Sequence, residues 1–217
     1  MRLVYSLKLS ELQMTGQTKQ QRRIVMIPTK EQALALLNEA YERNPGPWKS
    51  HSIVVAECAY AISKQCFGLD KDKAYILGLL HDIGRREGVT NLAHVIDGYQ
   101  YLMKLGYEEA ARICITHSFS DKNMDTYIGA HDVSKEGLQL ISSLMKEYVY
   151  DDYDRLIQLC DSIALPEGPV SIEVRMNDVK HRYGYYPVSK WNKHIELKAY
   201  FEKKSGLDID YLVLYDA

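Results

Sequence analysis

The chain lacks any long apolar run and any strong excess of charge of one sign. No stretch of its 217 residues approaches the roughly eighteen apolar residues of a membrane-spanning helix, and the N-terminus lacks a signal-peptide pattern. Lys and Arg number 27 against 29 Asp and Glu, a net charge of -2. Because this balance forces no basic surface on the protein, we expect neither nucleic acid nor a membrane as its main partner.

The sequence also lacks a paired-cysteine motif. Its four cysteines, Cys58, Cys66, Cys114 and Cys160, form no C-x-x-C pair, and three of them fall within apolar helical patterns. Cysteine in such a pattern behaves as a small hydrophobic residue. A thiol metal site and a disulfide framework are therefore disfavoured, and we expect a reduced, cytoplasmic protein.

Alternating strand patterns are almost absent, apart from RRIVMI at 22–27 and the tail DYLVLY at 210–215. Apolar residues instead recur at helical spacing. A first helix is expected from the N-cap Thr29 to the break NPGPW at 44–48, because two prolines and a glycine cannot continue a helix. Further helices are predicted at about 49–67, 70–83, 92–103, 107–117, 135–148, 151–164, 169–183 and 189–204. The sequence therefore predicts an all-α fold.

The domain organisation predicted from these patterns is a single helical bundle with two extensions. Residues 1–25 are polar and weakly patterned, and are expected to form an N-terminal extension. Residues 26–184 form the domain, and residues 185–217 are predicted to be a C-terminal helical extension of the same domain. Gly84 is expected to end the third helix, since glycine suits a helix C-cap.

Histidines and aspartates lie in or beside the apolar patterns, where a core is expected: His51, His81, Asp82, His94, His117 and Asp161. A buried carboxylate without a partner costs several kcal/mol, so it must be paired or bound to a metal. Taken singly, a histidine at a helix end is usually hydrogen-bonded or stabilised by the helix dipole, and Asp161 could pair with an arginine. Six such residues from several helices instead indicate a metal site inside the bundle.

His81 and Asp82 are adjacent in the sequence. Neighbouring residues on a helix point about 100° apart, so both can face one ion only if it lies off the helix end. A carboxylate has two oxygens, however, and Asp82 could bridge two ions. Imidazole together with carboxylate suits Fe, Mn, Zn, Co or Ni and would not select Ca.

The order His51, His81-Asp82, Asp161 in a helical chain resembles the H…HD…D signature of the HD-domain metal-dependent phosphohydrolases. The resemblance covers roughly residues 26–184 and includes the motif HDIG after an apolar helix. It implies that these four residues are metal ligands. It also implies a hydrolase of phosphoester or phosphoanhydride bonds.

Two further histidines, His94 and His117, lie between the HD pair and Asp161. This layout resembles the binuclear subgroup, which includes bacterial symmetrical diadenosine tetraphosphate hydrolases and cyclic-di-GMP phosphodiesterases. The resemblance implies two divalent transition-metal ions with both histidines as ligands. The alternative is that one of them contacts only the substrate or another ligand. The GYP element of the cyclic-di-GMP enzymes is missing from its expected context, which argues against that substrate.

Two arginines are candidates for phosphate binding. Arg85 follows HDIG where the cyclic-di-GMP enzymes carry a lysine, and Arg175 resembles an arginine shortly after the last aspartate of the dinucleotide hydrolases. Arginine offers a planar, bidentate fork that suits a phosphate. For Arg85 the alternative is an exposed arginine near a helix end. Asp82 completes the candidate catalytic set.

A second His-Asp pair, His131-Asp132, lies in a polar, Gly-flanked stretch without a preceding apolar helix. We expect this pair to lie outside the metal site. Asp132 or Ser134 is predicted to cap the helix that follows, since both residue types are common N-caps.

The function expected from the sequence is hydrolysis of a small phosphorylated metabolite, with a nucleotide or dinucleotide as the favoured class, by a metal-activated water. Two alternatives stay open. A di-iron HD-type oxygenase would use the same ligands, and a nucleotide-sensing module would have no catalysis. The expected partner is a small molecule, and self-association of the chain is left open.

Overall fold

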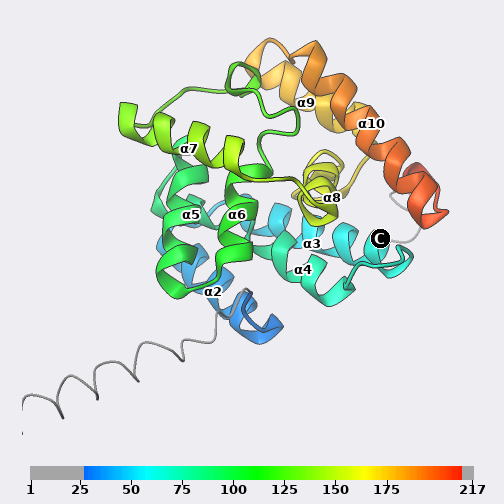
Figure 1. The fold of residues 1–217 in the computed structure, drawn as a ribbon, viewed down its shortest axis with the longest axis horizontal. Helices are drawn as coiled ribbons and strands as arrows, with labels where there is room; N and C mark the ends of the chain where they lie inside the picture. Colours follow the sequence, from blue (N-terminus) through cyan, green and yellow to red (C-terminus); the bar gives the residue numbers. More distant parts are fainter. Residues whose placement is uncertain (1–26, 212–217) are drawn as a thin grey trace, which may run out of the picture.

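The structure is a computed structural model that describes residues 27–211, and helices dominate it (Figure 1). The helices are α2 Lys30–Arg43, α3 Trp48–Lys64, α4 Lys71–Leu80, η1 Ile83–Glu87, α5 Ala93–Leu105, α6 Glu108–Thr116, η2 Met124–Thr126, α7 Lys135–Glu147, α8 Asp152–Asp161, α9 Ile172–Tyr183 and α10 Val188–Ser205. Two short strands, β1 Ala164–Leu165 and β2 Gly168–Pro169, pair antiparallel. The all-α prediction is confirmed.

The first described helix starts as its sequence indicates. Thr29 Oγ1 accepts from the backbone of Gln32 at 3.2 Å, and the Gln32 side chain accepts from Thr29 N at 2.9 Å, which makes a capping box. The NPGPW segment then separates α2 from the next helix, and α3 begins at Trp48. Local capping and proline chemistry therefore fix where these two helices begin.

The centre of the fold is the pair α3 and α4, which pack along each other. Gly78 allows the close approach, because a Cβ there would lie 2.6 Å from Ala56 Cα. Helices α2, α6 and α8 pack against α4. A second apolar cluster joins α7 to α5 and α6 through Leu92, Ile115, Phe119 and Ile141.

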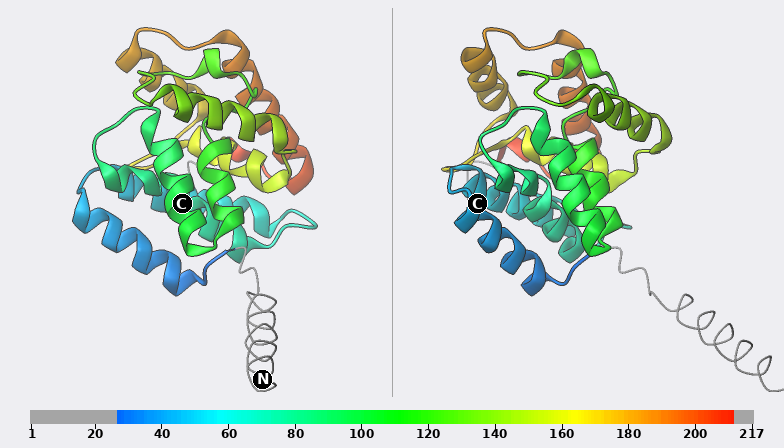
Figure 2. Two further views of the ribbon diagram at one scale, coloured as in Figure 1. Left: turned by 60° about the vertical axis from the view of Figure 1, so that its left-hand side comes forward. Right: turned by 90° about the vertical axis from the view of Figure 1, so that its left-hand side faces the viewer.

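Helices α9 and α10 lie at the end of the molecule away from α2, and α8 lies on their inner side, toward α3 and α4 (Figures 1 and 2). Helix α10 contacts α8, α3 and α9. Its residues Leu197 and Phe201 belong to the same buried cluster as the residues of α3 and α4. Helix α10 therefore packs on the same core as α3 and α4. The domain bounds stay a prediction.

Four predicted helix boundaries are wrong, and the first is the end of α3, which lies at Lys64 and not at about 67. Helix α4 ends at Leu80 and not at Gly84, which lies inside η1. A Cβ at Gly84 would lie 1.9 Å from the His94 carbonyl oxygen, so glycine is needed there for η1 to approach α5. Helix α8 ends at Asp161, because the β1–β2 hairpin follows, and this hairpin also delays the start of α9 to Ile172.

The predicted extension 1–25 and most of the two strand patterns lie outside the described residues. The four cysteines are buried and free. No helix within residues 27–211 is both long and apolar enough to cross a membrane.

Candidate metal centre

Helix ends bring the predicted metal ligands together. His51 lies in the first turn of α3 and His94 in the first turn of α5, whereas His81 and His117 directly follow the last residues of α4 and α6. These four histidines and Asp82 are at most 7 % exposed. Asp161, the last residue of α8, is different, because its side chain is 28 % exposed. Its carboxylate therefore lies at the solvent edge of the centre.

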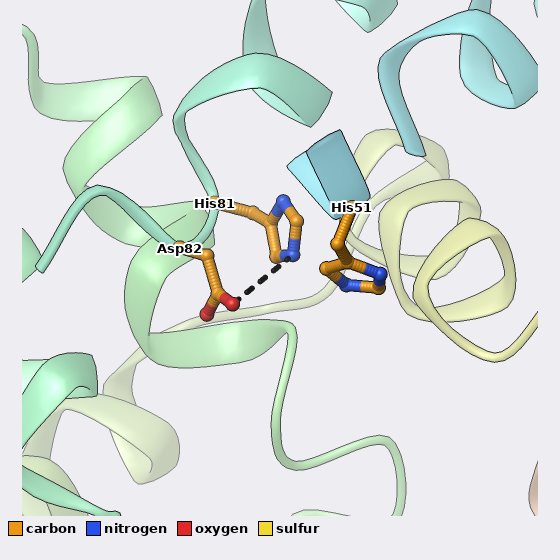
Figure 3. Close-up of side chains that lie close together, drawn as sticks. All are labelled: His51, His81 and Asp82. Carbon is orange, nitrogen blue, oxygen red and sulfur yellow. Dashed lines mark ion pairs between the residues drawn. The ribbon is translucent and has the colours of Figure 1, made fainter. Parts of the chain in front are cut away.

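Asp82 stands between two sets of histidines. His94 Nε2 and His117 Nε2 lie 3.2 and 3.6 Å from its Oδ1, whereas His81 Nε2 lies 4.0 Å from its Oδ2 (Figure 3). Two groups of ligand atoms, each within 4.8 Å of one another, share this residue: His51 with His81 and Asp82, and Asp82 with His94 and His117. Oδ1 of Asp82 therefore lies toward His94 and His117, and Oδ2 lies toward His81.

The end of α4 explains how two adjacent residues face one point. His81 still has helical backbone angles, with φ -58° and ψ -36°, whereas Asp82 has left the helix with φ -104° and ψ 14°. Asp82 therefore does not continue the helix, and its Oδ2 lies 4.0 Å from His81 Nε2. Both point toward the centre off the helix end, near His51 (Figure 3).

Backbone carbonyls orient three of the imidazoles. The Nδ1 atom of His81 donates to Gly78 O at 2.7 Å and that of His117 to Ile113 O at 3.1 Å, and His94 Nδ1 donates to Asn91 O. A proton fixed on Nδ1 leaves the lone pair on Nε2, the atom that faces the centre. Metal-binding histidines are commonly held in this way.

The electrostatics of the centre favour the ligand forms of its side chains. Burial lowers the pKa of His81, and burial together with the neighbouring His81 lowers the pKa of His117 to about 3. Burial alone would raise the pKa of Asp82, but the charges of Arg85, His94 and His81 hold it well below its usual range. Neutral imidazoles and ionised carboxylates are the forms that bind metal ions.

Asp161 pairs with His51, whose Nε2 lies 3.0 Å from Asp161 Oδ1. Burial opposes ionisation of this carboxyl group, but the His51 hydrogen bond and the charges of His51 and Arg175 keep its pKa well below the usual value. A divalent ion bound at this pair would replace the proton that the two side chains share.

Two buried polar atoms in the centre lack a hydrogen-bond partner within the described part of the chain: His81 Nε2 and Asp82 Oδ1. Buried polar groups rarely stay unsatisfied, because the desolvation cost is then uncompensated. A divalent transition metal accepts both imidazole nitrogen and carboxylate oxygen as ligands. The donor set therefore fits such an ion.

Both predicted arginines adjoin the centre, each beside a carboxylate. Arg85 Nε donates to Asp82 Oδ2 at 2.6 Å, and its guanidinium also reaches Thr90 O at 3.4 Å. Arg175 Nε donates to the Asp161 carbonyl oxygen at 3.3 Å, with its Nη2 3.7 Å from Asp161 Oδ1. Phosphate binding by either residue stays a prediction.

The His131-Asp132 pair belongs to neither group of ligand atoms. Asp132 nevertheless acts on the centre, because its carboxylate accepts from the backbone of Asn91 at 2.7 Å and of Ala93 at 2.8 Å. It therefore caps the start of α5, which carries His94. Of the two residues predicted to cap the following helix, Asp132 and Ser134, the second is confirmed. Ser134 does cap α7, since its Oγ accepts from Gly137 N at 3.1 Å.

The sequence did not predict a polar network between α8 and the end of α6, next to His117. Asp154 is fully buried and accepts from Thr116 Oγ1 at 2.7 Å and from Arg112, while Gln158 Nε2 donates to Thr116 O at 2.8 Å. These contacts fix the end of α6, from which His117 projects. One sequence signal was present, because Asp154 stands three residues after the N-cap Asp151 and completes a capping box.

Comparison with known proteins gives one finding beyond this geometry. The HD domain family matches residues 48–165, which is more than half of the chain and contains His51, His81, Asp82, His94, His117 and Asp161. No curated protein and no solved structure matches the chain. The family match and the buried His/Asp cluster agree, and the chain therefore belongs to the HD domain family.

Proposed function

We propose that the protein is a metal-dependent phosphohydrolase with a two-ion centre, acting on a small phosphorylated metabolite of the nucleotide or dinucleotide class. HD domain proteins are mostly metal-dependent hydrolases, which gives the reaction type. The observation that carries the two-ion centre is the position of Asp82, shared by two groups of buried ligand atoms. The layout resembles the binuclear subgroup that includes the symmetrical diadenosine tetraphosphate hydrolases.

In this proposal His51, His81 and Asp82, with Asp161 at the solvent edge, hold one ion. Asp82, His94 and His117 hold the other. Bound divalent ions supply Lewis acidity, which lowers the pKa of water and draws electron density from a phosphoryl oxygen.

The protein's own residues prepare the centre. Arg85 holds Asp82 through a short ion pair, so the carboxylate stays ionised and fixed in orientation. Arg175, from α9, donates to the backbone carbonyl of Asp161, and its charge helps to keep the Asp161 carboxylate ionised. Positive charge from the two guanidinium groups lies where a phosphate would bring negative charge, and such preorganised groups stabilise charge that develops in a transition state.

The test is hydrolysis of a panel of nucleotides and dinucleotides by the Mn²⁺-loaded protein under anaerobic conditions, followed by separation of the nucleotide products and by assay of inorganic phosphate. We expect hydrolysis of at least one member of the panel. Asp82→Ala should abolish both metal binding and hydrolysis, because it removes the shared ligand, and should leave a helical circular-dichroism spectrum. Hydrolysis by metal-free Asp82→Ala protein would contradict the proposal.

The oxygenase alternative uses the same ligands but needs O₂. Oxygen consumption by the iron-loaded protein, without hydrolysis of any nucleotide or dinucleotide, would favour that alternative. Binding of a nucleotide without either reaction would favour a sensing module.

A further inference from the structure

Lys190 is a buried cation next to the metal centre. It is the third residue of α10, and the residue is only 8 % exposed. Its Nζ donates to the carbonyl oxygen of Ser118 at 2.8 Å. Ser118 Oγ in turn lies 3.0 Å from His117 Nε2, one of the candidate ligand atoms. Ser118 thus links Lys190 to His117, a residue of the candidate metal centre.

The charge of Lys190 has no ion-pair partner within residues 27–211. The acidic residues with the largest influence on it, Asp161 and Asp121, attract it only through space, and neither lies within ion-pair distance. Asp121 Oδ1 accepts from Thr126 Oγ1 at 2.7 Å, and its Oδ2 accepts from Ser189 Oγ at 3.1 Å. The carboxylate of Asp161 faces His51 and Arg175, as described above. Both acidic neighbours of Lys190 are therefore engaged elsewhere.

The surroundings of Lys190 disfavour a positive charge that lacks a counterion. Burial and the nearby Arg175 charge lower the pKa of Lys190 to about 8, with Asp161 and Asp121 opposing this shift. Lys190 also lies in the first turn of α10, where the helix dipole is positive, and Pro187 gives no side-chain cap. A buried, unpaired charge is costly, and an anion bound beside it would offset that cost.

Two further groups lie near Lys190. Arg175, whose side chain is 16 % exposed, reaches the edge of the centre from α9. His194 lies one turn after Lys190 on α10 and is 4 % exposed. Its Nε2 is 3.4 Å from Ser120 Oγ, and its Nδ1 has no hydrogen-bond partner in the described part of the chain. An unpaired lysine, an arginine and a free imidazole nitrogen form a set that suits a phosphate group.

We infer that Lys190 and Arg175 form a subsite for a second phosphate group of the substrate, beside the one that is hydrolysed at the metal centre. The substrate then carries a chain of at least two phosphates. This inference rests on the proposed function for the reaction and includes Arg175, which the family resemblance already suggested for phosphate binding. Lys190 lies after the matched segment 48–165, so neither the family match nor the resemblance supplies its role.

Calorimetric titration of the full-length protein with inorganic diphosphate, and separately with inorganic phosphate, tests the subsite. Wild type should bind diphosphate about tenfold or more tightly than phosphate, because a charge-assisted contact is worth roughly 1.5–3 kcal/mol. Lys190→Gln can still donate to Ser118 O but has lost the charge, and its diphosphate affinity should fall about ten- to a hundredfold. Lys190→Arg should keep most of the affinity.

Lys193→Gln is the matched control, since Lys193 lies on the same helix, is 40 % exposed and pairs with Glu196. It should leave both affinities unchanged. Equal affinity of the wild-type protein for diphosphate and phosphate would overturn the inference, and this result does not depend on any variant. Unchanged diphosphate affinity in Lys190→Gln would overturn it as well, and would leave Lys190 as a structural anchor of Ser118.

The substrate panel separates this inference from the proposed function. Failure to hydrolyse any compound of the panel would refute the proposed function without affecting the calorimetry. Hydrolysis of nucleoside monophosphates as efficiently as of di- and triphosphates would support the proposed function and overturn the subsite.

Discussion

His194 shows how a single side chain can make the stability of this fold depend on pH. Burial and the neighbouring charge of Lys190 lower its pKa to about 3, although Asp161 and Asp121 act in the opposite direction. In the unfolded chain a histidine has a pKa of about 6.5. Between these two values the unfolded state binds more protons, so acidification favours unfolding.

We therefore predict that the contribution of His194 to stability is complete above about pH 6.5 and is lost as the pH falls toward 3. Over that range wild type should lose about 1.4 kcal/mol per pH unit more than His194→Gln does. Urea unfolding at pH 7, 6 and 5 measures the difference. His181→Gln is the control, because His181 is exposed. Parallel pH profiles for wild type and His194→Gln would contradict the buried, neutral state of His194.

The candidate ligands lie mostly at helix ends. The positions of these ends depend on contacts between one element and another. Gly84 is one such contact, because η1 approaches α5 at the turn that carries His94. A Cβ at Gly84 would lie 1.9 Å from His94 O and 2.5 Å from Gly98 N, both backbone atoms. No flexible side chain can move aside to make room.

Gly84→Ala is predicted to destabilise the protein by about 3 kcal/mol or more, since overpacking against backbone forces the two elements apart. Chemical denaturation gives the value. Gly137→Ala is the matched control, because the nearest atom to a Cβ there is Val133 Cβ at 3.3 Å. Near-neutral stability of Gly84→Ala would show that η1 and α5 are not held as closely as described.

Asp132 is the second contact between elements, and we predict that it positions His94. Asp132→Ala removes two hydrogen bonds to the start of α5 and should cost about 1–2 kcal/mol of stability, as loss of an N-cap does. It should also weaken binding of one of two metal ions by about tenfold, the usual effect of losing a residue that orients a ligand.

Metal titration and thermal unfolding of Asp132→Ala beside His131→Ala give both quantities. His131→Ala should behave as wild type, because its ring contacts Tyr127 at 5.8 Å between centroids and lies outside both ligand groups. Equal metal affinity in Asp132→Ala and wild type would remove its positioning role.

The elements that the sequence predicts best are those whose signals are local. The capping pair Thr29 and Gln32 acts within a few residues, and so does the NPGPW segment. The starts of α2 and α3 could therefore be predicted from the sequence alone. The prediction of Gly84 as a C-cap used only its helix neighbours. The constraint that requires glycine there comes from the His94 backbone, ten residues away, and no local signal shows it. The contacts of Asp132 could not be predicted for the same reason, since its partners at 91 and 93 precede it by about forty residues.

At the scale of the whole molecule, residue types and spacing were enough to name the six candidate ligands, because polar residues inside apolar helices need an explanation. The structure adds which residues face which oxygen of Asp82. Lys190 could not be found from sequence, since an amphipathic helix with several lysines gives no sign of which one is buried. Its burial depends on how α10 packs across α8 and α3.

The measurement that tests the central claim most directly is a crystal structure of the Mn²⁺-loaded protein with anomalous scattering from the metal. We predict two anomalous peaks per chain, one contacted by His51, His81 and Asp82 and the other by Asp82, His94 and His117. A single peak, with both His94 and His117 beyond coordination distance of any metal, would contradict the two-ion centre bridged by Asp82.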